Sequence, residues 1–152
     1  MEFRRASAKD GIGIARIEED CFSDPWSYRS IEDLICTEGS MCFVAVEDPN
    51  TENEKVIAYF IGRLIAPEGE LYRIAVAPAY RKRGIGYRLM DYSVKTSRGK
   101  GLETLFLEVR SQNHVARRLY TSYGFEEMGI RRNYYKDPLD DAVIMIHSRC
   151  GI

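Results

Sequence analysis

The most constraining feature of this sequence is a strand pattern that leads through a basic, glycine-containing loop into an amphipathic helix. Residues 70–76 read as a strand, which Pro78 ends, and residues 81–86 form the loop. Residues 84–98 read as a helix with one apolar face, made by Ile85, Leu89, Met90 and Val94. A strand, a short loop and a helix in this order are typical of α/β domains.

The rest of the chain predicts a mixed α/β domain in the order β-α-α-β-β-β-α-β-α-β-β. Ser7 and Ser27 are expected to cap two early helices, and Gly124 is expected at the C-terminus of the last one. Pro67 and Gly69 are expected to turn the chain into the third strand of the central group. The other expected elements are an extended start (1–5), strands (41–46, 56–65, 105–109), a helix (115–123) and a closing hairpin (125–135 with 142–146).

The composition predicts one globular domain over residues 1–152. The chain is 45% hydrophobic, which is enough for one core, and its length is too small for two domains. A net charge of −1 argues against nucleic acid or an anionic membrane as a direct partner. No apolar run reaches the roughly 18 residues of a membrane span, and the N-terminus lacks a signal-peptide pattern. We therefore expect a cytoplasmic protein, with a monomer as the default expectation.

The cysteines and histidines do not form a metal motif. Neither His114 nor His147 has acidic or thiol neighbours at ligand spacing, so no metal is expected. Cys36 and Cys42 are interpreted as small buried hydrophobic residues, and structural roles are expected for Cys21 and Cys150 as well.

The loop at residues 81–86 has the chemistry of a pyrophosphate site. Gly84 and Gly86 let backbone N–H groups approach a ligand at a helix N-terminus, and three adjacent basic side chains add positive charge. The spacing fits neither a P-loop nor a dinucleotide fingerprint, which would need a third glycine near Leu89. From the motif alone, a solvated basic turn before a surface helix is slightly favoured over a pyrophosphate site.

Two further residues suggest acid–base chemistry. Glu108 is a carboxylate within an apolar strand, where burial would favour the protonated form and make a usable base near neutral pH. Tyr120 is a phenol on the following helix that could protonate a leaving thiolate. The alternatives are an ion pair of Glu108 with Arg110 or another cation at a strand end, and simple packing of Tyr120.

These motifs together resemble the GNAT superfamily of N-acetyltransferases. Residues 81–86 are similar to its Q/R-x-x-G-x-G/A loop. Residues 107–113 (L-E-V-R-x-x-N), 116–125 (A-x-x-L-Y-x-x-x-G-F) and 131–135 (R-R-N-Y-Y) resemble its RimI-type ribosomal-protein-alanine N-acetyltransferases, over almost the whole chain. The resemblance implies a mixed, mostly antiparallel sheet with about four helices and a V-shaped splay between two central strands.

The resemblance also implies roles for individual residues. Glu108 matches the general base and Tyr120 the general acid. Acetyl-CoA would be the co-substrate, contacted by Ile74, Ala75, Val76, Arg81, Lys82, Arg83, Gly84, Ile85, Gly86, Tyr87 and Asn113. The acceptor peptide would be contacted by Trp26, Glu70, Tyr134 and Tyr135. Packing remains the alternative for Trp26 and the two tyrosines, and a solvated strand end for Glu70.

The expected reaction is direct transfer of acetyl to an amine, which the resemblance identifies as the N-terminal alanine of a small-subunit ribosomal protein. At pH 7 deprotonation costs about 1.4 kcal/mol for an α-amine and about 4.6 kcal/mol for lysine, which favours the α-amine. A small-molecule amine is the second possibility, for which Glu18, Glu19, Asp20 and Asp24 could build an acidic pocket. A non-catalytic acyl-CoA-binding protein is the third.

Overall fold

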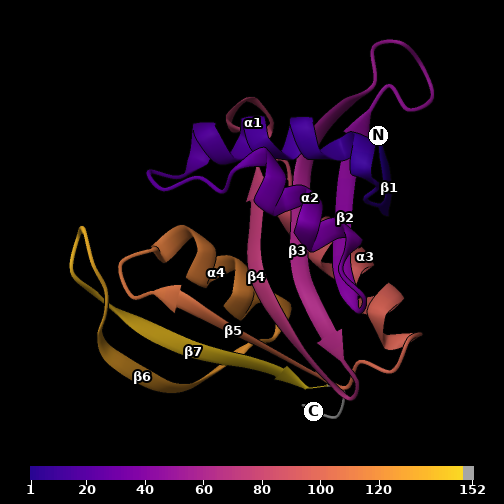
Figure 1. Cartoon of the computed structure of the whole chain (residues 1–152). Coiled ribbons are helices and arrows are strands. Elements are labelled where there is room, and N and C mark those ends of the chain that lie inside the picture. Colours follow the sequence, from indigo (N-terminus) through magenta and orange to yellow (C-terminus); the bar gives the residue numbers. More distant parts are fainter. Residues whose placement is uncertain (149–152) are drawn as a thin grey trace.

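The computed structural model describes residues 1–148, which form one seven-stranded sheet with helices on both faces (Figure 1). The strand order is β1-β2-β3-β4-β5-β7-β6, and neighbouring strands are antiparallel except for the parallel pair β4 and β5. The strands are β1 (Glu2–Arg5), β2 (Ser40–Glu47), β3 (Lys55–Ile65), β4 (Glu68–Val76), β5 (Thr104–Arg110), β6 (Glu126–Tyr135) and β7 (Asp140–Ser148).

Four α-helices cover the sheet. They are α1 (Gly11–Cys21), α2 (Tyr28–Cys36), α3 (Ile85–Arg98) and α4 (His114–Tyr123). One apolar cluster packs α1 and α2 against β2 and β3, and a second packs α3 and α4 against the opposite face. No helix within residues 1–148 is long and apolar enough to cross a membrane.

The helix ends follow the local sequence signals. The Ser27 hydroxyl accepts a hydrogen bond from the Ser30 N–H (3.1 Å) at the start of α2. Gly124 adopts the left-handed conformation (φ +111°) at the end of α4. Ser7 instead precedes a short 3-10 turn, Ala8–Asp10, that leads into α1.

The expected splay lies between β4 and β5. Their pairing runs only from Glu68 opposite Thr104 to Leu71 opposite Leu107, after which the two strands separate. At the same point β4 has a bulge, because Ile61 of β3 faces Arg73 whereas its neighbour Gly62 faces Leu71. Gly62 permits this close approach, since a Cβ atom there would lie 2.3 Å from the Glu70 carbonyl oxygen.

Three expectations about local structure need correction or fall outside the described residues. The strand that was expected at residues 70–76 is β4, and it begins earlier, at Glu68. Gly69 therefore lies within the strand, and the turn before it is shorter than expected. Cys36 is exposed, because it ends α2 on the side away from the buried residues Ile31 and Ile35, whereas Cys42 is buried as expected. Cys150 lies outside the described residues.

Candidate active site

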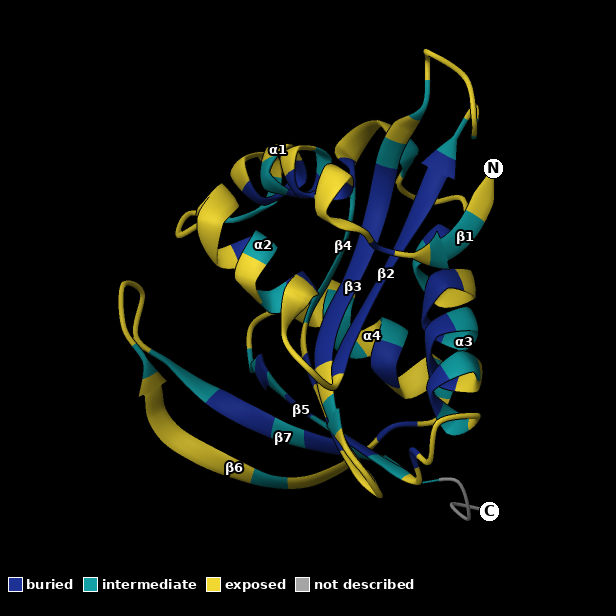
Figure 2. Ribbon diagram, turned by 45° about the vertical axis from the view of Figure 1, so that its right-hand side comes forward, coloured by how far each residue is buried: buried dark blue, intermediate teal, exposed yellow. Residues whose placement is uncertain are grey.

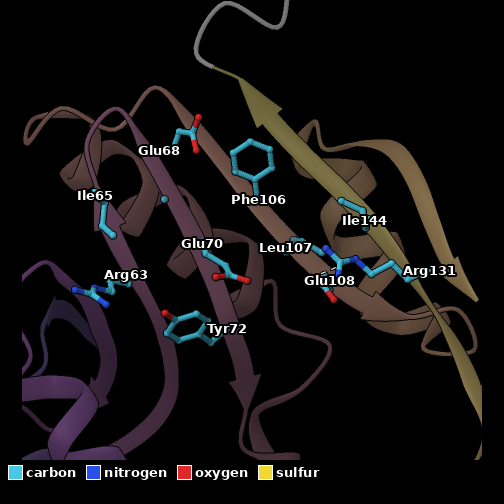
Figure 3. A pocket seen from close by; sticks show the side chains of 11 residues that line it. Arg63, Ile65, Glu68, Glu70, Tyr72, Phe106, Leu107, Glu108, Arg131 and Ile144 are labelled. Atoms are coloured by element: carbon cyan, nitrogen blue, oxygen red, sulfur yellow. Dashed lines mark ion pairs between the residues drawn. The ribbon is translucent and has the colours of Figure 1, made fainter. Parts of the chain in front are cut away.

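A cavity of about 650 Å³ lies over the paired stretch of β4 and β5 and extends to the point where the two strands begin to separate (Figure 3). It lies on the sheet face that carries α1 and α2, in the part that these helices leave uncovered. Its polar and aromatic lining is Arg63, Glu68, Glu70, Tyr72, Phe106, Glu108 and Arg131. Among the predicted site residues, the cavity therefore brings together Glu70 and Glu108, whereas Trp26, Tyr120, Tyr134 and Tyr135 do not line it.

Glu108 is the first residue of β5 beyond the last residue paired with β4. Its Oε1 lies 3.9 Å from Arg131 Nε, whereas its Oε2 is buried and accepts no hydrogen bond from residues 1–148. The side chain is 23% exposed, so it is less buried than the sequence suggested. The cation of the ion-pair alternative is therefore Arg131 and not Arg110, because the Arg110 guanidinium donates to the carbonyls of Pro138 and Lys136. Glu108 thus lines the cavity with a carboxylate whose Oε2 has no donor within residues 1–148.

Tyr120 lies in the core below the split. It is 7% exposed and packs against Phe125 with ring centroids 5.6 Å apart. Burial, and to a smaller extent nearby Tyr135, raises the pKa of Tyr120 well above the ordinary tyrosine value. Burial, followed by the charge of Glu108, also raises the pKa of Tyr135. Tyr135 therefore lies within electrostatic range of both proposed catalytic groups, and Tyr120 stays protonated at neutral pH.

The loop before α3 has a backbone suited to an anion. Gly84 is the N-cap in the left-handed region (φ +74°), and no side chain within the described residues caps the first turn. Its free N–H groups and the helix dipole fit a pyrophosphate, so acetyl-CoA is compatible with this loop.

Two of the three basic side chains of the loop face protein partners, because Arg81 donates to the Val76 carbonyl (3.2 Å) and Arg83 lies over the Tyr80 ring. Lys82, also in the left-handed region (φ +62°), is exposed.

The other residues that were predicted to contact acetyl-CoA range from buried to exposed. Ile74, Ala75 and Val76 are half-buried at the separated end of β4, and Ile85 is buried. Asn113 is the N-cap of α4, where its side-chain oxygen accepts from the Ala116 N–H (3.2 Å). Exposed Tyr87 packs edge-on against Tyr123. Cys21 also reaches this region, with its thiol donating to the Val76 carbonyl (3.8 Å), a contact that sequence spacing could not reveal.

Two segments flank the cavity. In the β6–β7 hairpin, Tyr134 is 48% exposed and Tyr135 is half-buried beneath the Arg110 guanidinium (4.4 Å from the ring centroid). In the loop between α1 and α2, the half-buried Trp26 stacks on Arg73 (4.3 Å). Nothing in the sequence indicated that Arg73 holds this loop, because its partners Trp26 and Glu18 lie far away in the chain.

The acidic residues considered for a small-amine pocket do not form one together. Glu18 is completely buried and paired with Arg73, whereas Glu19, Asp20 and Asp24 are exposed. Within residues 1–148, no three acidic, histidine or cysteine side chains gather as a metal site.

The fold and the motifs define the class of protein. The family model described as Acetyltransferase (GNAT) family matches residues 12–125, and the chain belongs to this family. The expected family and fold class, including the split sheet, are thereby confirmed.

Particular relatives sharpen this placement. The [Ribosomal protein bS18]-alanine N-acetyltransferase of Haemophilus influenzae is 33% identical over 135 residues, covering 87% of this chain and 88% of the relative. Its counterpart in Escherichia coli K12 is 42% identical over 97 residues, covering 62% of this chain and just under two thirds (66%) of that relative. The crystal structure of the ribosomal-protein-S18-alanine N-acetyltransferase from Escherichia coli superposes with a TM-score of 0.86 at 32% identity, covering 97% of this chain and 92% of that one.

Proposed function

We propose that this protein transfers the acetyl group of acetyl-CoA to the N-terminal α-amine of a protein in the cytoplasm, specifically the N-terminal alanine of ribosomal protein S18. The observation that carries the proposal is Glu108, a carboxylate that lines the cavity beside the split of the sheet and whose Oε2 has no hydrogen-bond donor within residues 1–148. The names of the relatives that share the fold and sequence support the choice of substrate.

In the proposed reaction, Glu108 accepts a proton from the substrate ammonium group, directly or through one water. No donor in the described residues competes for its Oε2, and the partly exposed side chain lines the cavity. The weak 3.9 Å contact with Arg131 leaves the carboxylate orientated without saturating it. An α-amine suits this base, because its deprotonation at pH 7 costs about 1.4 kcal/mol.

Tyr120 is proposed to protonate the thiolate that leaves when the amine attacks the thioester. The phenol is protonated at neutral pH and so carries the proton that it would donate, while its raised pKa makes it a weaker acid than an ordinary tyrosine. The acetyl group passes directly from sulfur to nitrogen in a ternary complex. An acyl-cysteine step is not supported, because burial raises the pKa of Cys42 to about 11, and neither Cys21 nor Cys36 lines the cavity.

The loop before α3 would hold the pyrophosphate through its backbone N–H groups, and Ile74–Val76 would lie along the pantetheine arm. The peptide would enter from the cavity side, between the loop that carries Trp26 and the hairpin that carries Tyr134 and Tyr135. Glu70 lies in this cavity as an exposed carboxylate and is proposed to contact the peptide.

The test is acetyl-CoA turnover with three acceptors: an S18 N-terminal peptide, the same peptide with a blocked N-terminus and an internal lysine, and spermidine. We expect turnover only with the free N-terminus. Turnover confined to lysine or spermidine would overturn the substrate assignment while keeping the chemistry. No turnover with any acceptor, under conditions where acetyl-CoA binds, would indicate a non-catalytic binding protein.

A further inference from the structure

Glu18 is a completely buried carboxylate that the proposed chemistry does not use. It lies on α1 and accepts hydrogen bonds from three different elements. The donors are the Tyr59 hydroxyl of β3, Arg73 Nη1 of β4 (2.5 Å) and the Trp26 backbone N–H of the α1–α2 loop (2.7 Å). An ionised carboxylate is costly to bury unless it is paired and fully hydrogen-bonded, and this arrangement satisfies both oxygens.

Arg73 extends the contact into the loop of residues 22–27. Its guanidinium carbon lies 4.3 Å from the ring centroids of both Phe22 and Trp26, and Nη2 approaches the Asp24 carbonyl (3.4 Å). A planar guanidinium can pair with a carboxylate at its edge and stack on aromatic rings with its faces. The loop is therefore arranged around Arg73, and Glu18 orientates Arg73.

This network is coupled to the cavity through β4. Tyr72, which lines the cavity, directly precedes Arg73 and is the residue without a partner at the β4 bulge. Glu18 thus connects the start of the split, where Glu108 lies on the opposite strand, with the loop that carries Trp26.

We propose that Glu18 is a positioning residue that, with Arg73, holds the α1–α2 loop in the conformation that receives the N-terminal segment of the substrate protein. This inference rests on the proposed function and deepens it. A buried ion pair adds little stability compared with apolar packing, so its value here lies in fixing one loop geometry.

The chain offers a matched control on the same side of the sheet. Asp10 is also a buried carboxylate (3% exposed) and pairs with the guanidinium of Arg4 at 2.7 and 2.8 Å. It contacts Ser7 and Arg4, and neither residue lies in the α1–α2 loop or the cavity. Asp10→Asn therefore removes a comparable ion pair without disturbing the proposed docking loop.

The first measurement is steady-state kinetics of Glu18→Gln and Asp10→Asn at a temperature where both are folded. For Glu18→Gln we expect kcat/KM for the S18 peptide to fall about tenfold, because a misplaced binding element costs orientation. The KM for acetyl-CoA should change less than about twofold, and Asp10→Asn should leave both parameters within that range. An equal loss of peptide kcat/KM in both variants, or no loss in Glu18→Gln, would overturn the proposal.

The second measurement does not depend on turnover. Trp26 is the only tryptophan, so acrylamide quenching of intrinsic fluorescence reports directly on the loop. Quenching should increase in Glu18→Gln and stay unchanged in Asp10→Asn. Unchanged quenching in Glu18→Gln would refute the positioning role even if turnover fell. If the wild-type protein acetylated none of the acceptors, the proposed function and the peptide-binding part of this inference would fail, while quenching would still decide whether Glu18 orders the loop.

Arg73→Lys covers the case in which Glu18→Gln does not fold. Lysine keeps the positive charge beside Glu18 but loses the planar stack on Phe22 and Trp26. We expect increased Trp26 quenching and a fall in peptide kcat/KM of about threefold, smaller than in Glu18→Gln because the charge pair remains. Wild-type values for both readouts would overturn the proposal.

Discussion

Strands β3 and β5 are both internal to the same sheet and both appear as apolar runs in the sequence, yet they are buried very differently (Figure 2). Six consecutive residues of β3, from 57 to 62, are buried, because α1 and α2 cover one face and α3 the other. In β5 only alternate residues are buried, and Phe106 and Glu108 face the cavity instead. An apolar strand can therefore be buried on both faces or line a site with one face, depending on which helices pack against it.

The largest effect should come from the uncovered face of β5. Glu108→Gln removes the proposed base, so kcat/KM for the S18 peptide should fall by about 10²- to 10⁴-fold. The melting temperature should stay near the wild-type value, because Glu108 forms only a long contact with Arg131. Activity within about threefold of wild type would remove Glu108 from the mechanism.

A substitution in β3, the strand covered on both faces, should change the stability of the protein. Phe60 is 0% exposed on β3, so Phe60→Ala should lower the free energy of unfolding by about 3–5 kcal/mol through lost burial and a cavity. Urea denaturation followed by circular dichroism measures this change. A loss below about 1 kcal/mol would mean that the two strands differ less than their burial indicates.

Tyr120 is buried in the core, like the residues of β3, and has a proposed role in catalysis, like Glu108 of β5. Tyr120→Phe should lower kcat about 100-fold, as expected for the loss of a general acid, with little change in the KM for acetyl-CoA. Because the pKa of Tyr120 is raised, the phenol stays protonated as pH rises through the ordinary tyrosine value. The wild-type kcat should therefore show no alkaline fall from Tyr120 at pH values near 10. Steady-state thiol release across pH tests both points, and an unchanged kcat in Tyr120→Phe would exclude the role.

The smallest expected effect is on stability at Phe106, the counterpart of Phe60 on the uncovered face. Phe106 is only partly buried, so Phe106→Ala should cost about 1 kcal/mol in the free energy of unfolding. Because Phe106 lines the cavity, the same change should raise the peptide KM more than the acetyl-CoA KM. If Phe106→Ala and Phe60→Ala lowered the free energy of unfolding equally, the cavity-facing side of β5 would be as well covered in solution as β3.

Local signals predicted most of the fold. The periodicity of residues 84–98, the Ser27 cap and the Gly124 cap depend on contacts within a few residues, and the structure agrees with each. Cys36 was misassigned as buried, because the face of α2 that meets the sheet is set by its packing and not by the hydrophobicity of one residue.

Site residues were harder to predict where their partners are remote in sequence. Glu108 and Tyr120 stood out as a carboxylate and a phenol within otherwise apolar surroundings, and their motifs supported them. Arg81 was predicted to contact the coenzyme, and its hydrogen bond to the Val76 carbonyl is an additional contact that the motif did not indicate. Glu18 was considered only as part of an acidic pocket for a small amine, because its pairing with Arg73 spans 55 positions.

By itself, the sequence determined the order of strands and helices, the glycine-containing loop before α3 and the family, because these depend on periodicity and short motifs. Only the tertiary structure decided where the expected split lies, after Leu71 of β4 and Leu107 of β5 with Glu108 at an open face, and that Glu18 is buried against Arg73. The physical reason is that burial and charge pairing depend on which surfaces meet in space, and those surfaces come from segments far apart in the chain.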